Sequence, residues 1–454
     1  MELRGLNSSN AVGTRSWLLS RGAVMAALAV LVLVCSVALD LVLLPHDGGL
    51  GHDFSAFYAA GLTLRHGHDP YSWSQLGATE AHLRSIGDPR QPVCRSQLQA
   101  CNPYANPPLF AWAMAAFTVV PERPAYVIWL AAMVAAMLGS VALLASWDGM
   151  GRRSWALLVF AVTPAPVIGY FLGQQTPLLL IALAAALTAL RRERPALAGI
   201  LLTVGWIKPH LMFPIALVLV AMLGRPQARR LLAGLLCASA LLGLASWLLT
   251  GEALGIAWVR GLSLWGHTLD TVQPDLSSLA GVYLSVVGRP WSVYVGAAIV
   301  GAWLLFAALL VRKVRREGLA PADDRWLRLL ALALASWLLA TPYAHPADLV
   351  LLVPVLPVLL GRHLGGLADP QVRLALGMLL IAPEADLLGF RPNLWLSYSV
   401  LVPLTMLIAL RPWRIVGERR DSGRMTMTSG SAGSCNTHTL ACVGSPSDAA
   451  EVGY

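Results

Sequence analysis

Long apolar runs recur along the chain from residue 22 to residue 410, separated by short polar segments. A helix needs roughly 20 apolar residues to cross a bilayer, and fewer where it is short or broken. The pattern therefore predicts an all-α polytopic membrane protein with about twelve transmembrane helices. The predicted spans are 22–44, 124–146, 155–172, 176–190, 195–207, 209–223, 228–249, 291–311, 325–341, 347–360, 372–388 and 394–410.

Basic residues between these runs assign the sides of the membrane, because Lys and Arg collect in cytoplasmic loops. With the spans above, every basic cluster falls on one side, which places both termini in the cytoplasm. The clusters are Arg4/Arg15/Arg21, Arg152/Arg153, Arg191/Arg192/Arg194, Arg225/Arg229/Arg230, Lys313/Arg315/Arg316, Arg362 and Arg411/Arg414.

The apolar segment 107–121 is too short for a span. Counting it as a crossing would move every later basic cluster to the outer side of the membrane. We therefore expect a re-entrant or membrane-skimming segment whose ends are buried by the rest of the protein. The predicted organisation is a cytoplasmic tail at 1–21, a membrane domain at 22–411 and a low-complexity, disordered cytoplasmic tail at 412–454.

Composition excludes several classes of protein. The chain is 57% hydrophobic and only 13% charged, whereas about a quarter of residues are charged in a soluble protein. The net charge of +9 is explained by the loop arginines rather than by nucleic-acid binding. No phosphate-binding glycine loop and no hydrolase or zinc motif is present. We expect no cofactor. The sequence leaves open whether a divalent metal helps, because one acid and scattered oxygens do not define a metal site.

The rare polar groups gather on the predicted outer side, in two larger loops at 45–106 and 250–290 and at three helix breaks. In the first loop, Asp53 precedes a helical pattern and can be read as a helix N-cap. It can equally act as a general base just above the bilayer. At the first break, "GQQT", Gly173 can end one helix and Thr176 can cap the next.

In the same turn, the amides of Gln174 and Gln175 either complete a helix hairpin or donate to phosphate oxygens. Lys208 lies at the second break, immediately before Pro209. A lysine at membrane depth favours an anion-binding role over a snorkelling helix cap. At the third break, "TPYAHPADL", Asp348 fits a helix N-terminus, whereas His345 suits phosphate binding or proton transfer.

Five segments, taken in order, carry a family resemblance: "DFSAFYAAGLTLRHGHDPYS", "YANPPLFAWAMAAFTVVP", "GQQTPLLL", "LAGILLTVGWIKPHLMFP" and "TPYAHPADLVLLVPVL". This order resembles the polyprenyl-phosphate-sugar-dependent glycosyltransferases of family 87, which include mannosyltransferases of actinobacterial envelope glycolipids. The resemblance implies the GT-C membrane fold, a lipid-linked sugar donor, a glycolipid or glycan acceptor, and activity on the outer face of the plasma membrane.

The resemblance also implies site residues. Asp53 takes the place of the family's general base, which deprotonates an acceptor hydroxyl for inverting attack on the donor's anomeric carbon. Lys208 matches a "KP" position, His345 a late histidine, and Gln174 or Gln175 a "GQ" position. We expect these to hold the donor phosphate, whose charge grows in the transition state. Weaker candidates for the acceptor or sugar are His52, Tyr58, Tyr104, Asn106, Trp265 and His267.

Two departures from the family pattern leave specificity open. "TPYAHPAD" has a single histidine where mannosyltransferases of the family tend to be rich in His and Trp, so mannose is only the best guess. The first loop also carries a longer insert with Cys94 and Cys101, which can form a disulfide if the loop is outside the cell.

Three other activities compete with this interpretation. A secondary transporter of a small polar solute also places polar groups at helix breaks. We see no inverted repeat, however, and the polar groups gather at one face rather than at the membrane midplane. A lipid-linked polymer ligase usually concentrates its cations in one late loop, whereas the loop at 250–290 holds only Arg260 and Arg289. An arabinofuranosyl-type transferase of the same fold remains the third alternative.

Overall fold

A computed structural model describes most of the membrane region of the chain. The described residues are 30–31, 33–35, 38, 51–86, 104–147, 157, 161, 164–266, 278–280, 291–360, 370–371, 373–374, 377–378 and 404–407. All of them belong to the first of two units of the chain, Met1–Arg411 and Pro412–Tyr454. Their secondary structure is entirely helical, which agrees with the predicted all-α class.

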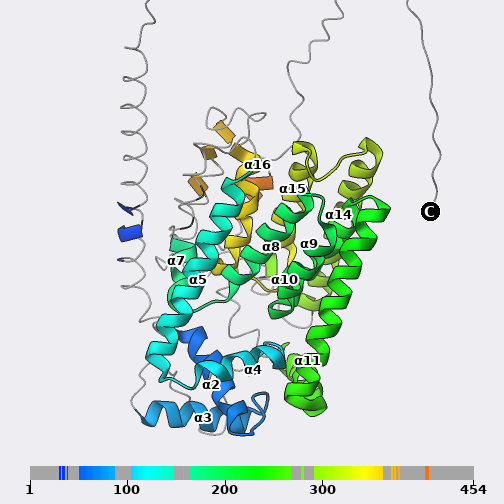
Figure 1. Cartoon of the computed structure of the whole chain (residues 1–454). Helices are drawn as coiled ribbons and strands as arrows, with labels where there is room; N and C mark the ends of the chain where they lie inside the picture. The colour runs from blue at the N-terminus through cyan, green and yellow to red at the C-terminus, as the bar shows by residue number, and fades with distance from the viewer. Residues whose placement is uncertain are drawn as a thin grey trace, which may run out of the picture. The chain divides into compact units, whose positions relative to one another are not determined.

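The helices α2 (His52–Arg65), α3 (Trp73–Ser85) and α4 (Pro108–Phe117) lie together at one end of the helical bundle (Figure 1). Backbones of α2 and α4 approach closely at Gly61, where an added Cβ would lie 2.6 Å from the carbonyl carbon of Met114. With ten residues, α4 extends only about 15 Å. It is too short to cross a bilayer, and its predicted entry into the membrane stays a prediction.

Among the described residues, three helices are long and apolar enough to cross a membrane, by length and composition. They are α5 (Glu122–Ala145), Arg225–Leu262 within α11 (Arg225–Gly266), and α14 (Trp291–Glu317). These helices indicate a membrane protein. The number of spans, predicted as twelve, is not confirmed, and the predicted spans 22–44, 372–388 and 394–410 lie largely outside the described residues.

The other helices of the bundle are shorter. They are α7 (Pro164–Leu172), α8 (Thr176–Arg191), α9 (Pro195–Leu202), η3 (Thr203–Ile207), α10 (Pro209–Met222), α15 (Asp324–Ala340), η5 (Pro346–Val355) and α16 (Leu356–Leu360). Proline lies in the first two positions of α8, α9, α10 and η5. Because proline lacks an N–H and fixes φ, it favours a helix start and ends the preceding segment. The breaks in the apolar runs thus follow from these prolines.

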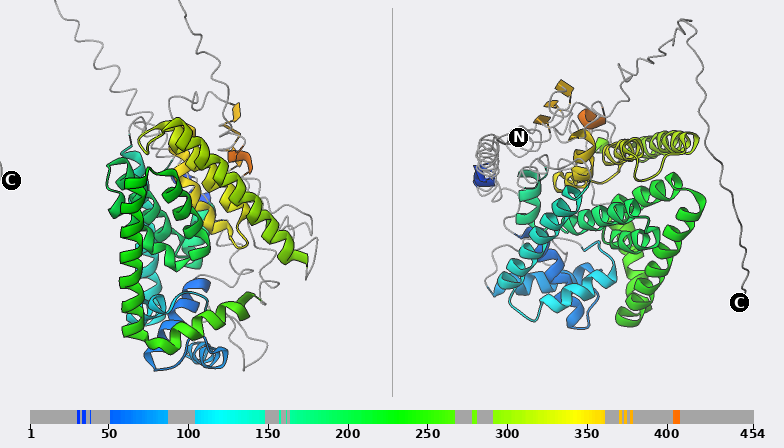
Figure 2. Two further views of the ribbon diagram at one scale, coloured as in Figure 1. Left: turned by 90° about the vertical axis from the view of Figure 1, so that its right-hand side faces the viewer. Right: turned by 45° about the horizontal axis from the view of Figure 1, so that its top comes forward.

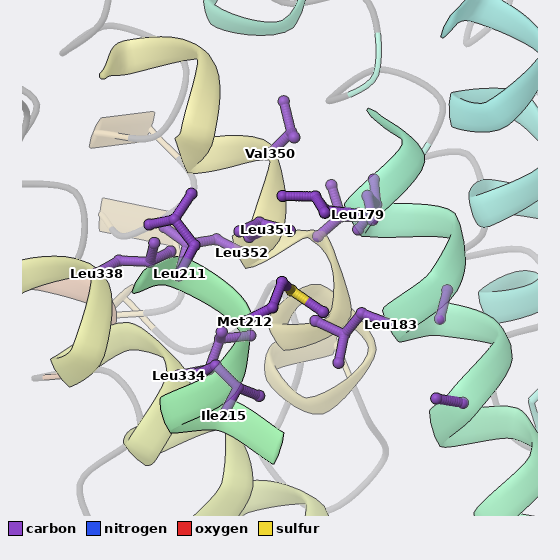
Figure 3. Packing of buried hydrophobic residues seen from close by; sticks show 14 of the residues in the cluster. Leu179, Leu183, Leu211, Met212, Ile215, Leu334, Leu338, Val350, Leu351 and Leu352 are labelled. Carbon is purple, nitrogen blue, oxygen red and sulfur yellow. The ribbon is translucent and has the colours of Figure 1, made fainter. Parts of the chain in front are cut away.

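An apolar core joins α8, α10, α15 and η5, as Figure 3 shows. It is made of Leu179, Leu183, Leu211, Met212, Ile215, Leu334, Leu338, Val350, Leu351 and Leu352, all of them buried. Lipid tails are as apolar as these side chains, so close packing rather than escape from water holds such helices together.

Small residues let α9 and α11 pack backbone to backbone. A Cβ added at Gly199 of α9 would lie 2.0 Å from the carbonyl oxygen of Leu231, and one added at Gly234 of α11 would lie 2.1 Å from that of Ala196. Such contacts between glycine-bearing faces are typical of helix pairs in membranes.

The first part of the region predicted as the second outer loop, 250–290, is helical. Helix α11 bends at Gly251, where φ is 78° and ψ is 165°, and then continues as a helix to Gly266 (Figure 2). These angles are accessible essentially to glycine alone, which explains the bend at this position. After the bend, Trp258 Nε1 donates to the carbonyl oxygen of Ala105 at 3.0 Å, so α11 contacts the chain just before α4.

Candidate active site

Asp53 lies in the first turn of α2 and is half-buried. The helix begins at His52, and its N-cap is Gly51 in the left-handed conformation, with φ of 76°. The interpretation of Asp53 as an N-cap is therefore wrong: glycine takes that position because it tolerates positive φ. The Gly51 N–H donates to the carbonyl oxygen of Phe171 at 2.5 Å, which ties the start of α2 to the end of α7.

The turn between α7 and α8 brings Gln174 to Asp53. Gly173, with φ of 82°, ends α7 as predicted. The N–H of Gln174 donates to Gly169 O at 2.8 Å and that of Gly173 to Tyr170 O at 3.0 Å, which is the Schellman pattern of hydrogen bonds. An added Cβ at Gly173 would lie 2.5 Å from the Cβ of Phe54, so α2 packs directly on this turn.

A hydrogen bond then joins the two side chains. Gln174 Nε2 donates to Asp53 Oδ2 at 2.5 Å. Within the described part of the chain, this is the sole hydrogen bond to the Asp53 carboxylate. One carboxylate oxygen is thereby held, and the other stays available to a substrate.

Lys208 lies between η3 and α10, next to Pro209, as predicted. Only 7% of the residue is exposed. Its Nζ donates to Gln174 Oε1 at 2.9 Å, to Asp348 Oδ1 at 2.7 Å and to Thr176 Oγ1 at 3.4 Å. An ammonium group has three N–H donors, and all three point at protein acceptors here.

Asp348 is the counter-ion of Lys208 and is fully buried. It lies in the first turn of η5, as predicted, where its Oδ2 accepts from the His345 N–H at 3.0 Å. Its Oδ1 accepts from Thr176 Oγ1 at 2.6 Å as well as from Lys208. Burying a charge is costly unless it is paired and hydrogen-bonded, and Asp348 meets both conditions.

The sequence predicted that Thr176 caps α8, and this prediction is wrong. Gln175 is the N-cap of that helix, and Thr176 is its first residue. Because the Thr176 hydroxyl donates to Asp348, it links α8 to η5 instead of closing its own helix.

His345, predicted to bind phosphate, is the N-cap of η5 and lies next to the ion pair. Its Nε2 is 2.7 Å from the hydroxyl of Tyr343, and the two rings contact edge to face with centroids 4.8 Å apart. His210, which the sequence did not single out, also contacts Tyr343, with ring centroids 5.5 Å apart.

Gln175 belongs to a second group of hydrogen-bonded polar side chains. Its Nε2 donates to Asn106 Oδ1 at 3.0 Å, whereas its buried Oε1 has no hydrogen-bond partner among the described residues. The Asn106 carbonyl accepts from the Tyr71 hydroxyl at 2.7 Å, and the Tyr71 and Tyr104 rings lie 5.6 Å apart. Burial, with a smaller effect of the Asp69 carboxylate, raises the pKa of Tyr71.

Burial, and to a smaller extent the neighbouring Tyr71, also raises the pKa of Tyr104 well above its usual value. Both phenols therefore stay neutral and act as hydrogen-bond donors. The predicted acceptor residues Tyr104 and Asn106 thus lie in one group with Gln175.

The remaining predicted residues that the structure describes lie in α2 and α11. Tyr58 is buried and donates to Val120 O at 3.0 Å, which is a contact between α2 and the segment that joins α4 to α5. His52 opens α2 beside Asp53. Trp265 lies in α11, but its side chain is outside the described residues, as are His267, Cys94 and Cys101.

Sequence reasoning missed the roles of Asp348 and Thr176. The signal was available, because a lysine at a helix break in an apolar sequence requires a buried counter-ion. Few acids lie near helix breaks in this chain, and Asp348 is one of them. No group of three or more His, Cys, Asp or Glu side chains that could hold a metal occurs in the part of the chain that the structure describes.

We define the polar junction as Asp53, Gln174, Thr176, Lys208 and Asp348, which five hydrogen bonds connect. It combines one half-exposed carboxylate with a buried, neutralised ion pair. A carboxylate with a free oxygen can accept a proton from a hydroxyl, so the arrangement is suited to general-base chemistry.

Comparison with known families gives one match. The family model described as glycosyltransferase family 87 matches residues 104–342, more than half of the 454-residue chain. No curated protein matches the chain, and no solved structure does.

Proposed function

Because the chain belongs to glycosyltransferase family 87 and is a membrane glycosyltransferase, we propose that it transfers a sugar from a polyprenyl-phosphate donor to a glycolipid or glycan acceptor with inversion. Mannose is the proposed sugar. The proposed site of action is the extracytoplasmic face of the plasma membrane, with both termini in the cytoplasm. The proposed architecture is the GT-C fold with twelve spans.

The observation that carries this proposal is the hydrogen-bonded position of Asp53. Its Oδ2 is held by Gln174, and no other residue in the described ranges donates to the carboxylate. In the proposed step, Asp53 takes the proton of the acceptor hydroxyl. The hydroxyl oxygen forms a bond to the anomeric carbon, the bond from that carbon to the phosphate oxygen breaks, and the lipid phosphate leaves with the electron pair.

A single carboxylate suffices for this chemistry. Glycoside hydrolases need a second carboxyl group to protonate their leaving group. A phosphate leaves as an anion and needs no proton at neutral pH. It does need nearby donors or positive charge, because negative charge develops on it in the transition state.

We propose that the phosphate binds on the side of Lys208 and His345, with Gln174 and Gln175 nearby. His345 and Gln174 both contact the Lys208–Asp348 pair, which supports grouping them. On the other side, Asn106 and Tyr104 are proposed to contact the acceptor or the sugar. The Oε1 of Gln175, which has no partner within the described ranges, is an acceptor and suits a sugar hydroxyl better than a phosphate oxygen.

The test uses purified protein in lipid vesicles with radiolabelled polyprenyl-phosphate-mannose and a crude envelope lipid extract. We expect label to move into a new glycolipid with inversion at the anomeric carbon. Transfer from polyprenyl-phosphate-arabinose alone would replace mannose by arabinose. Absence of transfer from both donors would contradict the proposed donor class.

A further inference from the structure

The polar junction contains a continuous chain of hydrogen bonds in which Lys208 donates both to Asp348 and to Gln174, and Gln174 in turn donates to Asp53. It runs from Asp348 through Lys208 and Gln174 to Asp53, over contacts of 2.7, 2.9 and 2.5 Å. Resting on the function proposed above, we propose that the buried Lys208–Asp348 ion pair is a positioning device that fixes the orientation of the Gln174 amide, and through it the general base Asp53.

The orientation of the Gln174 amide follows from which groups can donate. A lysine ammonium group donates only, so the Gln174 end that faces it must be the carbonyl oxygen. The amide nitrogen then faces Asp53 and donates to it. The Gln174 amide thereby holds the Asp53 carboxylate by its Oδ2 in one orientation and leaves the second oxygen for the acceptor hydroxyl in the proposed step.

The ion pair is itself held from three elements. Lys208 precedes α10, Asp348 lies in η5, and Thr176 opens α8 and donates to Asp348 at 2.6 Å. The backbone N–H of His345 holds the second Asp348 oxygen at 3.0 Å. Because Asp348 is fully buried and Lys208 nearly so, neither side chain has room to exchange these partners for water.

Without the ammonium group, the Gln174 amide loses the partner that orients it. The amide can then turn over and present its oxygen to Asp53, which repels the carboxylate oxygen instead of donating to it. The Asp53 carboxylate then loses the contact that fixes its orientation toward the acceptor hydroxyl. Lys208, Asp348 and Gln174 then act as positioning residues. The donor phosphate is proposed to lie on the same side as Lys208 without contacting it, because all three Lys208 donors are taken by protein acceptors.

Two other roles for Lys208 are distinguishable from positioning. A direct contact with the donor phosphate would make loss of Lys208 raise the KM for donor. A purely structural clamp between α8, α10 and η5 would lower stability without changing the turnover of folded protein.

The decisive variant is the double substitution Lys208→Met/Asp348→Asn. It removes both charges together, and the new asparagine side chain retains an oxygen for the His345 N–H, so the fold does not bury a lone charge. Lys208→Arg is the matched control, because it keeps a cationic donor facing Gln174. Each protein is assayed in vesicles for sugar transfer, with thermal unfolding measured in parallel.

We expect the double variant to fold, to keep the donor KM, and to lose about 10- to 1,000-fold in kcat, which is part of the roughly 100- to 10,000-fold that a general base contributes. Lys208→Arg is expected to retain most of the wild-type kcat. A wild-type kcat in the folded double variant would overturn the proposal, as would a raised donor KM with kcat unchanged.

A second measurement tests the inference independently of transfer. Infrared spectra at neutral pH are recorded for the double variant and for wild type, each with and without Asp53→Asn. We expect the carboxylate stretching band that Asp53→Asn removes to lie at a different position in the double variant than in wild type, because the carboxylate has lost the Gln174 N–H. The same position in both proteins would overturn the positioning role, even where transfer supports the proposed function. A shifted band without any transfer by wild type would leave the network standing and contradict the glycosyltransferase reaction.

Discussion

The helices α8, α10 and η5 have two contrasting regions. Their interiors pack on one another through apolar side chains, as Figure 3 shows for Leu183, Met212 and Leu351, among others. At their first turns, the same helices meet in a polar cluster built on Thr176, Lys208 and Asp348. The difference teaches that apolar packing in this membrane protein is separated along the helix axis from polar hydrogen bonding, which gathers at the helix starts where we propose the chemistry takes place.

This separation predicts different consequences of substitution. In the polar junction, a change at Lys208 or Asp348 leaves a buried charge without its partner and disturbs Asp53, the proposed general base. In the apolar core, a change leaves a cavity and lowers stability without reaching Asp53. The following substitutions test the contrast, in order of decreasing effect.

The largest effect is expected from Lys208→Met alone. The substitution leaves the fully buried Asp348 carboxylate without its cation. Removing one partner of a buried ion pair costs about 3–5 kcal/mol. Thermal or denaturant unfolding in detergent measures this loss, and adding Asp348→Asn is expected to recover most of it. If Lys208→Met alone is as stable as wild type, the charge of Lys208 does not stabilise the buried Asp348 carboxylate.

A somewhat smaller loss is expected from Leu183→Ala in α8. Leu183 is 1% exposed and lies in the core between α8 and α10. Truncating a buried leucine to alanine costs about 2–5 kcal/mol because a cavity remains. Sugar transfer per folded molecule is expected to stay at the wild-type rate. Leu248→Ala, at a position 68% exposed on α11, is the control and should leave stability nearly unchanged.

Should Leu183→Ala reduce kcat without lowering stability, the separation between packing and chemistry would not hold. The unfolding transition and the transfer rate are therefore measured on the same preparations.

The smallest effect is expected from Gly234→Ala in α11. The new Cβ would lie 2.1 Å from the carbonyl oxygen of Ala196, so α9 and α11 must move apart. Overpacking of this kind costs about 1–3 kcal/mol. Gly243→Ala, on the same helix with open space around it, is the matched control and should be neutral or slightly stabilising. Equal unfolding midpoints for the two variants would contradict the close packing of α9 on α11.

Much of the fold could be predicted from the sequence, because apolar runs and prolines are local signals. The helix starts at Pro195 and Pro209 and the helix end before Gly173 follow directly from the residues at those positions. The family was predicted from the order of short motifs and is confirmed by the match to residues 104–342. The continuation of α11 beyond Gly251 was not predicted, since a glycine that bends a helix resembles one that ends it.

The candidate site was only partly predictable. Polar residues at helix breaks, such as Gln174 and Lys208, are conspicuous in an apolar sequence and were identified. Their partners are far apart in the chain, and no local pattern pairs Lys208 with Asp348. The sequence also predicted that Asp348 lies at the start of its own helix, which is correct. That role did not reveal the ion pair, because one carboxylate can stabilise a helix start and pair with Lys208 at the same time.

The central claim is that Asp53 is the base of a sugar transfer from a lipid phosphate. Its most direct test compares wild type with Asp53→Asn in vesicles that contain the labelled donor and the acceptor extract. Asp324→Asn is the matched control, since Asp324 also lies in a first helical turn but on the exposed start of α15. We predict a loss of transfer of about 100- to 10,000-fold for Asp53→Asn, with unchanged unfolding, and none for Asp324→Asn. Wild-type transfer by a folded Asp53→Asn protein would contradict the account.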